Sequence, residues 1–168
     1  MSLRRQLAQW IPHLRRHARG LVLDRELADD LVQETLLRAL AREHQWQPDG
    51  NLRAWLFTLM HNLFVSDYRR RCRSPVVSVE ELPEQASQGD ADSECQLRDV
   101  SRALERLPPA WREVLLLVSI EGLSYEEVAR VLGIPLGTVM SRLHRARRRL
   151  AECLEEERPR LEVVHERS

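Results

Sequence analysis

The chain has 168 residues, which suits one ordinary domain or two small ones, and 43% of them are hydrophobic, enough to form cores. Its 26 basic residues, all arginine, are balanced by 26 acidic ones, so the net charge alone predicts no nucleic-acid partner. No apolar run reaches the roughly 18 residues of a membrane span, and no signal peptide is evident. These features argue against membrane insertion and favour a cytoplasmic protein.

The charges are unevenly distributed along the chain. Residues 1–20 hold five arginines and no acid, residues 69–73 hold four arginines, and residues 74–99 hold seven acids against one arginine. The neutral total therefore conceals basic faces on either side of an acidic segment. Aromatic residues and glycine are scarce and β-branched alternation is weak, which predicts an all-α fold.

Two amphipathic helices are predicted at the start of the chain, over residues 2–23 and 24–43. In the first, the apolar residues at helical spacing are Leu3, Leu7, Trp10, Ile11, Leu14 and Ala18. In the second, they are Leu27, Ala28, Leu31, Val32, Thr35, Leu36, Ala39 and Leu40. Acids crowd the start of the second helix, where they suit the helix dipole. Some of these polar residues also form a candidate exposed patch for a basic partner: Asp29, Asp30, Gln33 and Glu34.

Residues 44–51 contain Pro-Asp-Gly and are expected to form a loop, in which Trp46 either packs on the core or shapes a binding pocket. A third helix is predicted over residues 52–73. Its expected core face consists of Leu52, Trp55, Leu56, Leu59, Met60, Leu63, Phe64 and Tyr68. The opposite ridge consists of Thr58, Asn62, Ser66, Arg69 and Arg73. This ridge is either a solvated surface or a contact surface for phosphates and base edges.

Histidines and cysteines give no sign of a metal site. His13 and His17 lie one helical turn apart, but no third ligand is near them in the sequence. Cys72, Cys95 and Cys153 are widely spaced and predict neither a disulfide framework nor a zinc site. We expect reduced thiols, no metal and no cofactor.

The acidic segment rich in Pro, Ser and Gln predicts a flexible linker over residues 74–95. It separates a first helical domain, residues 1–73, from a second, residues 96–156, and a polar tail follows over 157–168. The linker suggests that the two domains hold no single relative orientation. Helices are expected over residues 95–107 and 109–121, and residues 152–157 carry no core pattern, so we expect them to fray.

Residues 124–150 have the pattern of a helix-turn-helix. Ser124 and Glu127 have the spacing of a capping box, Gly133 suits a helix end, and Pro135 suits a first turn. The second helix of such a motif enters the major groove of DNA. Its inward face is expected to hold Val139, Leu143, Ala146 and Leu150.

Arginine-rich helices are usually just solvated, but the second helix lacks the acidic partners that such a surface normally carries. No acid occurs from Leu136 to Ala151, and arginine suits phosphates and guanine edges. We therefore favour DNA binding. The candidate DNA contacts on this helix are Thr138, Met140, Ser141, Arg142, His144, Arg145, Arg148 and Arg149.

Taken together, residues 28–40, 52–71 and 104–150, in this order across an acidic linker, resemble a bacterial extracytoplasmic-function sigma factor of the sigma-70 superfamily. The resemblance implies a two-domain subunit that binds core RNA polymerase, directs it to promoters and helps melt the −10 region. It implies that Asp29, Asp30, Gln33 and Glu34 contact the β′ clamp coiled coil. It also implies contacts with the β subunit and an anti-sigma factor, which such proteins usually have.

The same resemblance assigns the two DNA surfaces. The second helix of the motif, residues 135–150, would recognise the −35 duplex, and its Met140 and His144 stand where a polar or aromatic base contact is expected. The ridge on the third helix would hold the unwound −10 strand through Thr58, Asn62, Ser66, Arg69, Arg70 and Arg73. His61 beside it would add a phosphate contact if charged, or would be a plain surface histidine.

Other functions remain as alternatives. A helix-turn-helix repressor or activator would act without polymerase, but no leftover dimerisation repeat is visible. A nuclease or other enzyme would need a nucleophile, metal cluster or phosphate loop, and the sequence predicts no catalytic residue and no small-molecule substrate. A sigma-like decoy without DNA binding is opposed by the intact arginine-rich helix.

Overall fold

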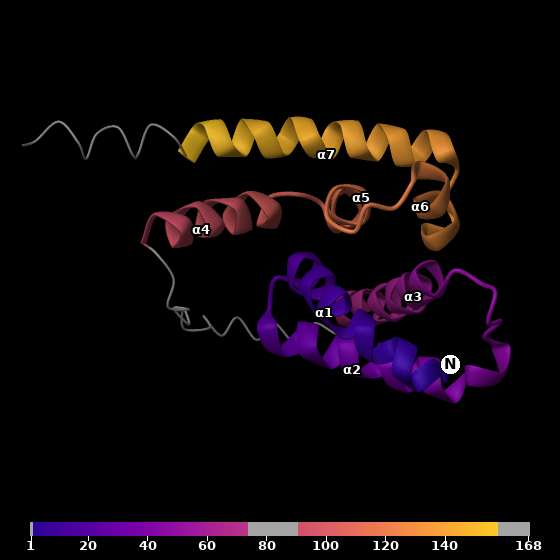
Figure 1. Cartoon of the computed structure of the whole chain (residues 1–168). Coiled ribbons are helices and arrows are strands. Elements are labelled where there is room, and N and C mark those ends of the chain that lie inside the picture. Colours follow the sequence, from indigo (N-terminus) through magenta and orange to yellow (C-terminus); the bar gives the residue numbers. More distant parts are fainter. Residues whose placement is uncertain (1, 74–90, 158–168) are drawn as a thin grey trace, which may run out of the picture.

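The computed structural model describes residues 2–73 and 91–157, and within these ranges the chain forms helices and no strand (Figure 1). The all-α prediction is confirmed. A short 3-10 turn, η1 (Glu43–Gln45), follows the second helix. The α-helices are α1 (Leu3–Val22), α2 (Arg25–Ala41), α3 (Leu52–Arg73), α4 (Ala91–Glu105), α5 (Pro109–Ser119), α6 (Tyr125–Leu132) and α7 (Leu136–Glu157).

Most of the predicted linker and nearly all of the predicted tail lie outside the described residues, and α4 begins at Ala91, earlier than the predicted start at residue 95. The described helices include none that is both long and apolar enough to cross a membrane.

The first half of the chain is built around α2, which packs against both α1 and α3. Asp24 starts α2, because its carboxylate accepts a hydrogen bond from the Leu27 N–H at 2.8 Å. Leu14, Ala28 and Leu56 are fully buried at the centre of this half. Burial of such apolar side chains is the main force that holds the three helices together.

The core face of α3 differs from the prediction at two positions. Phe57 is buried, whereas Tyr68 is 49% exposed. Phe57 is buried where it meets the ring of His17 of α1 edge-on, with centroids 5.0 Å apart. Tyr68 lies in the last part of α3, where residues 68–73 are all exposed. Trp46 packs on Trp55 at 5.5 Å, which settles its position in favour of the core.

The second half is a helix-turn-helix completed by α4 and α5. Val114 of α5, Val128 of α6 and Val139 of α7 are fully buried together, and α4 packs along α7. The predicted capping box is present: Ser124 Oγ accepts from the Glu127 N–H at 3.1 Å, and Glu127 Oε2 accepts from the Ser124 N–H at 2.8 Å. Gly133 has φ +63°, which allows the tight turn into α7.

Helix α7 is longer than predicted. The expectation that residues 152–157 fray is wrong, because α7 continues to Glu157 and buries Cys153 completely. A second anchor at this end is the ion pair between Arg106 and Glu156, whose nitrogen and oxygen are 2.6 Å apart. Cys153 was not counted as a core residue, so residues 152–157 showed no apolar pattern in the sequence. The last part of α7 was therefore not predicted.

The two halves pack directly against each other, contrary to the expectation of no single orientation. Three glutamates of the second half contact basic side chains of the first half. They are Glu113, Glu121 and Glu127. The closest contacts are 2.8 Å from Glu113 to His61, 3.1 Å from Glu121 to Arg16 and 3.3 Å from Glu127 to Arg53. The side chains of Glu113 and Glu121 are almost fully buried, so they need these partners.

Arg112 on α5 makes a further contact between the halves. Its Nε and one terminal nitrogen donate to the Leu21 carbonyl at the end of α1, at 2.9 and 2.6 Å. The other terminal nitrogen donates to the carbonyls of Leu104 and Leu107. Burial lowers the pKa of the Arg112 guanidinium, yet arginine remains charged in proteins. Arg112 therefore completes the last turn of a helix in the other half.

Candidate nucleic-acid interface

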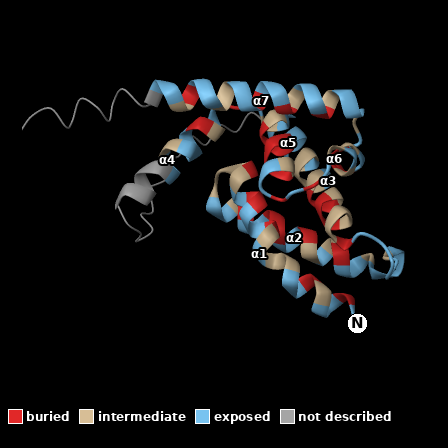
Figure 2. Cartoon of the chain, turned by 45° about the horizontal axis from the view of Figure 1, so that its top comes forward, coloured by how far each residue is buried: buried red, intermediate tan, exposed pale blue. Residues whose placement is uncertain are grey.

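The outer side of α7 is polar and accessible. Val139, Leu143 and Ala146 face the core, and the opposite side of the helix is exposed along its length (Figure 2). In Figure 1, α7 lies at the edge of the molecule, away from α1, α2 and α3. Of the predicted DNA contacts, Met140, Ser141, His144, Arg145 and Arg148 are exposed, and Thr138, Arg142 and Arg149 are half-buried.

The arginines of α7 do not share one environment. Arg148 and Arg149 both contact the carboxylate of Glu152, at 3.3 and 3.5 Å, so the acid-free stretch ends just beyond them. Among the described residues, no carboxylate lies within ion-pair distance of Arg142 or Arg145. Arg147, which is exposed, likewise has no ion-pair partner among the described residues. The uncompensated positive charge therefore lies on Arg142, Arg145 and Arg147, nearer the start of α7 than the pair at Arg148 and Arg149.

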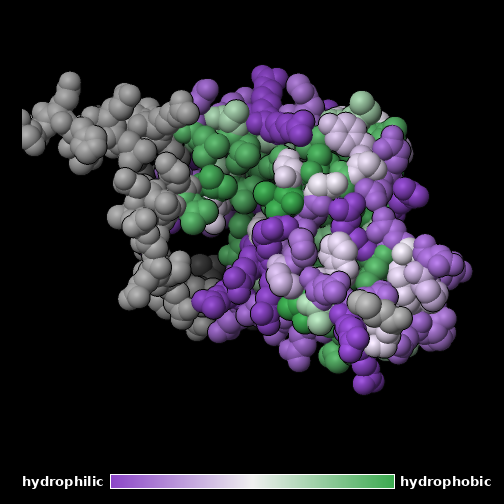
Figure 3. Space-filling view, in the orientation of Figure 1, coloured by the Kyte–Doolittle hydropathy of each residue, from purple (hydrophilic) through white to green (hydrophobic). Residues whose placement is uncertain are grey.

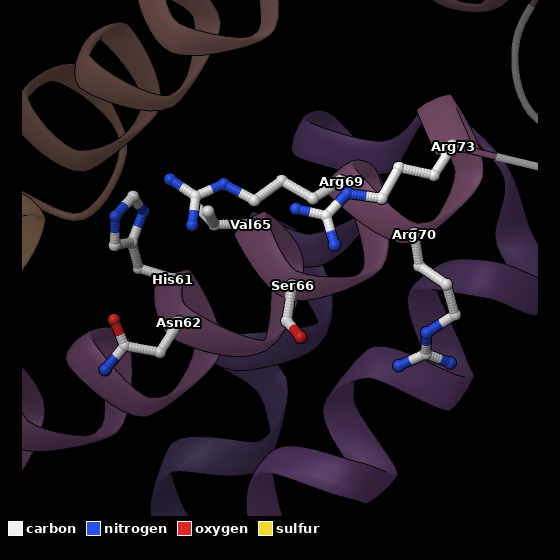
Figure 4. Close-up of a pocket in the computed structure, with 7 residues that line it drawn as sticks. All are labelled: His61, Asn62, Val65, Ser66, Arg69, Arg70 and Arg73. Carbon is white, nitrogen blue, oxygen red and sulfur yellow. The ribbon is translucent and has the colours of Figure 1, made fainter.

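A second basic surface lies on α3. An open hollow of about 670 Å³ is lined by Asn62, Ser66, Arg69, Arg70 and Arg73, together with His61 and Val65 (Figure 4). Five of the six predicted contacts on this helix thus come together. Thr58 does not line the hollow, and its hydroxyl donates to the Ala54 carbonyl at 2.8 Å.

His61 has a different environment from either predicted one. Its Nδ1 lies 2.8 Å from a carboxylate oxygen of Glu113 on α5, and its side chain is only 17% exposed. It is therefore neither a plain surface histidine nor a free phosphate contact. Sequence reasoning missed this pairing because the two residues are 52 positions apart.

The predicted acidic patch on α2 is exposed at all four positions: Asp29, Asp30, Gln33 and Glu34. Part of the patch lines a groove shared with α3, in which Asp30, Gln33 and Glu34 face Asn62 and Arg70. The patch and the basic hollow are therefore neighbours.

Some exposed apolar side chains were not predicted. Leu40 was expected in the core, but it is 36% exposed, and Leu37 is 53% exposed; Leu36 and Ala39 take the inward positions on this part of α2. In the second half, Leu97 and Val100 of α4 are exposed. Figure 3 shows hydrophobic residues gathered over α4 and α5 in the same region.

The two N-terminal histidines do not converge on a common site. His13 lies 3.4 Å from Glu121, whereas His17 is buried against Phe57, and its Nδ1 has no hydrogen-bond partner among the described residues. Burial, helped by the nearby charge of Arg16, lowers the pKa of His17 to about 3. The described residues contain no group of three or more His, Cys, Asp or Glu side chains that could hold a metal ion.

Comparisons with known proteins place both halves in one family. The family model described as "Sigma-70, region 4" matches residues 97–150, and the one described as "Sigma2 domain of PhyR" matches residues 7–61. The ECF RNA polymerase sigma factor EcfG of Rhodopseudomonas palustris (strain TIE-1) is 43% identical over 158 residues, which cover 91% of this chain and 85% of the relative. The chain belongs to the extracytoplasmic-function (ECF) family of RNA polymerase sigma factors.

Solved structures resemble this sigma factor over most of its length. The sigma factor RpoE from Bartonella quintana, in complex with the anti-sigma factor NepR, has a TM-score of 0.79 and 38% identity, and the match covers 90% of this chain and 96% of that one. CnrH, in complex with the cytosolic domain of CnrY, has a TM-score of 0.68 and 29% identity, with 90% and 86% covered.

The two matched stretches of this sigma factor correspond to its two halves. The region 4 match contains all eight predicted contacts on α7 and ends at Leu150, before Glu152 and Cys153. The other match contains the acidic patch of α2 and ends at His61, just before Asn62. The hollow on α3 therefore lies mostly beyond the matched stretch, and its assignment depends on its own chemistry.

Proposed function

We propose that this sigma factor binds core RNA polymerase, directs it to specific promoters and helps to melt the −10 region, with no catalytic chemistry of its own. Residues 1–73 act as the domain that binds polymerase and the −10 element, and residues 96–156 as the domain that binds the −35 element. Residues 74–95 connect them, residues 157–168 form a polar tail, and the protein works in the cytoplasm.

The proposed −35 surface is the outer side of α7. Of the arginines predicted to contact DNA, Arg142 and Arg145 lack acidic partners among the described residues, and they suit phosphates or the guanine edge. Met140 and Ser141 add an apolar and a hydroxyl contact beside them. Arg148 and Arg149 would exchange Glu152 for phosphate, so they contribute less per residue.

The proposed −10 surface is the hollow on α3. An amide, a hydroxyl and three guanidinium groups around one open volume can bind both the backbone and the exposed edges of unpaired bases. Contacts to unstacked bases offset the cost of opening the duplex, which is how binding can drive melting. Thr58, which does not line the hollow, is expected to matter least.

The proposed polymerase contact is the acidic patch of α2, with the exposed Leu37 and Leu40 at its side. Carboxylates beside apolar side chains fit a basic amphipathic partner such as the β′ clamp coiled coil, and the β subunit is expected to contact the second domain. Because the similar sigma factor RpoE was solved with the anti-sigma factor NepR, we infer that an anti-sigma factor also binds this chain.

One observation supports this function over that of a simple repressor: the chain carries two separate basic surfaces, one next to an acidic patch. A repressor needs only the helix-turn-helix. The direct experiment is to add the purified chain to core polymerase with genomic DNA and sequence the transcripts. Start sites that share −10 and −35 sequences are expected; transcripts without such a pattern would count against the proposal.

The polymerase contact can be tested with Asp30→Arg. Asp30 is exposed, so the fold should be unaffected, while a reversed charge in the patch should weaken association with core polymerase about tenfold. Co-purification or anisotropy with labelled sigma factor measures the change. Glu105→Arg, an exposed reversal on α4, is the matched control and should bind normally.

A further inference from the structure

The first turn of α7 contains a glycine that has no evident role among the residues that the structure describes. Gly20 and Gly50 are required by space, since a Cβ would lie 3.0 Å from Leu116 and from the Gln47 carbonyl, respectively. Gly122 and Gly133 have positive φ. Gly137 has no positive φ, and a Cβ built on it meets no atom of the described residues within 4 Å.

A glycine in this position weakens the helix. Glycine loses more conformational freedom on folding than alanine, so alanine is preferred wherever space and φ permit it. At residue 137 both conditions are met. The described fold alone would therefore favour alanine, and we look for the reason for glycine outside the described part of the chain.

The position of Gly137 indicates what the outside partner is. On a helical projection it shares the outer face of α7 with Ser141 and Arg148, opposite the buried Val139 and Leu143. Met140, which is 52% exposed, flanks it. In a helix-turn-helix, the first residues of the second helix contact base edges. Arg145 and Arg147, on either side of this face, have no acidic partner among the described residues, and such a surface fits a polyanion rather than a protein.

We propose that Gly137 provides the clearance that lets the first turn of α7 lie directly against the −35 duplex, so that Met140 and Ser141 reach the base edges. This inference rests on the proposed −35 function of α7. Hydrogen bonds to bases need about 2.7–3.2 Å between heavy atoms. A Cβ at residue 137 would hold the helix away from the groove by more than such bonds tolerate.

A side chain at residue 137 should affect base contacts and phosphate contacts differently. The arginine side chains are long enough to follow the phosphates when the helix is displaced, whereas short contacts to bases are lost. A side chain at residue 137 should therefore lower affinity for the correct promoter and leave affinity for unrelated DNA nearly unchanged. A general defect in folding or charge would not separate the two.

The test compares wild type with Gly137→Ala and Gly137→Leu, each assembled with core polymerase, on a promoter taken from the transcript-sequencing experiment. We expect free Gly137→Ala to melt about 1 to 4 °C higher than wild type. At fixed salt, promoter affinity should fall about tenfold for Ala and further for Leu. Affinity for core polymerase and for unrelated duplex should stay within about twofold of wild type.

The matched control is Ser101→Ala, an exposed substitution on α4 that should also favour the helix but leave promoter affinity unchanged. If Gly137→Ala melts lower than wild type, glycine is needed within the fold and the inference is wrong. It is equally wrong if Gly137→Ala keeps full promoter affinity, or if only core binding falls. A wild-type protein without promoter selectivity would instead refute the proposed function itself.

Discussion

His17 is a polar side chain in the centre of the first half, and its burial makes the fold sensitive to acid. Its pKa falls to about 3 in the folded protein, from an ordinary value of 6.5, chiefly because burial disfavours the charged ring. The unfolded chain therefore binds a proton more readily than the folded one between these two values. The contribution of neutral His17 to the free energy of unfolding is therefore fully present above pH 6.5 and is lost as the pH falls below that value.

We predict that lowering the pH from 7 to 4.5 removes about 2 to 3 kcal/mol of stability through His17. Over the same pH interval, the free energy of unfolding of His17→Leu should fall by less than that of wild type, and the difference should equal the contribution of His17. Urea unfolding at both pH values measures it. His44→Gln, which replaces an exposed histidine, serves as the control and should keep the wild-type dependence. Equal acid sensitivity of His17→Leu and wild type would contradict this account.

Of the arginines predicted to contact DNA, Arg145 is the one that is exposed and has no acidic partner among the described residues, so its charge should matter most to DNA. Arg145→Glu should lower promoter-specific transcription tenfold or more, since it both removes a contact and repels phosphate. Association with core polymerase should be unaffected. Run-off transcription gives the measurement, with Arg102→Glu on α4 as a control of equal charge; normal output from Arg145→Glu would remove α7 from the −35 assignment.

At the scale of elements, Glu127 connects the start of one helix to the start of another. Its carboxylate accepts from the Ser124 N–H, which begins α6, and from the Asn51 amide at 2.8 Å. Asn51 in turn accepts from the Ala54 N–H at the start of α3. The Ser124 N–H, assisted by Arg53, holds the pKa of the Glu127 carboxyl below its usual range. One side chain thus serves both a capping box and a contact between the halves.

We predict that Ser124→Ala and Glu127→Ala each cost about 1 kcal/mol of stability, through loss of the capping box. The two variants should differ in their coupling energy with Arg53→Ala. The pair Glu127–Arg53 should show a coupling of roughly 0.2–1 kcal/mol, as expected for a partly exposed ion pair, and Ser124–Arg53 should show none. Urea unfolding of the two double-mutant cycles checks this, and equal coupling in both cycles would contradict the dual role.

Helices and turns were predictable because their signals are local. Each of these signals spans only a few residues: the capping box at Ser124, the glycine at 133, and the apolar spacing within α2 and within α3. The exposed patches followed from the same spacing. The pairings of Glu113, Glu121 and Glu127 were not predictable, because a glutamate on a helix is equally suited to solvent, and its partner lies 52 to 105 residues away. Burial of His17 and Cys153 was missed for the same reason.

At the scale of the whole molecule, the contact between the halves depends on charge. The carboxylate of Glu121 contacts both Arg16 and His13 of α1, and its side chain is 1% exposed. An unpaired carboxylate there would be costly, so the pair should stabilise the closed arrangement.

We predict that Glu121→Arg separates the halves, because it replaces the buried carboxylate with a positive side chain that faces Arg16. The radius of gyration in small-angle scattering should rise by several ångströms above the roughly 15 Å expected for a compact chain of this length. Glu126→Arg, on the exposed side of α6, should leave it unchanged. The double variant Glu121→Arg/Arg16→Glu should restore compactness, and failure of both the expansion and the rescue would contradict a charge-dependent contact.

The bond from Arg112 to the Leu21 carbonyl makes the end of α1 a reporter of domain separation. When the halves part, that carbonyl loses its donor, and the last turn of α1 should fray. The amide of Leu23, which bonds to the Arg19 carbonyl in that turn, should then exchange its hydrogen with solvent faster. Exchange at this single backbone position would follow opening in the free protein and in any complex, without labels and without truncating the chain.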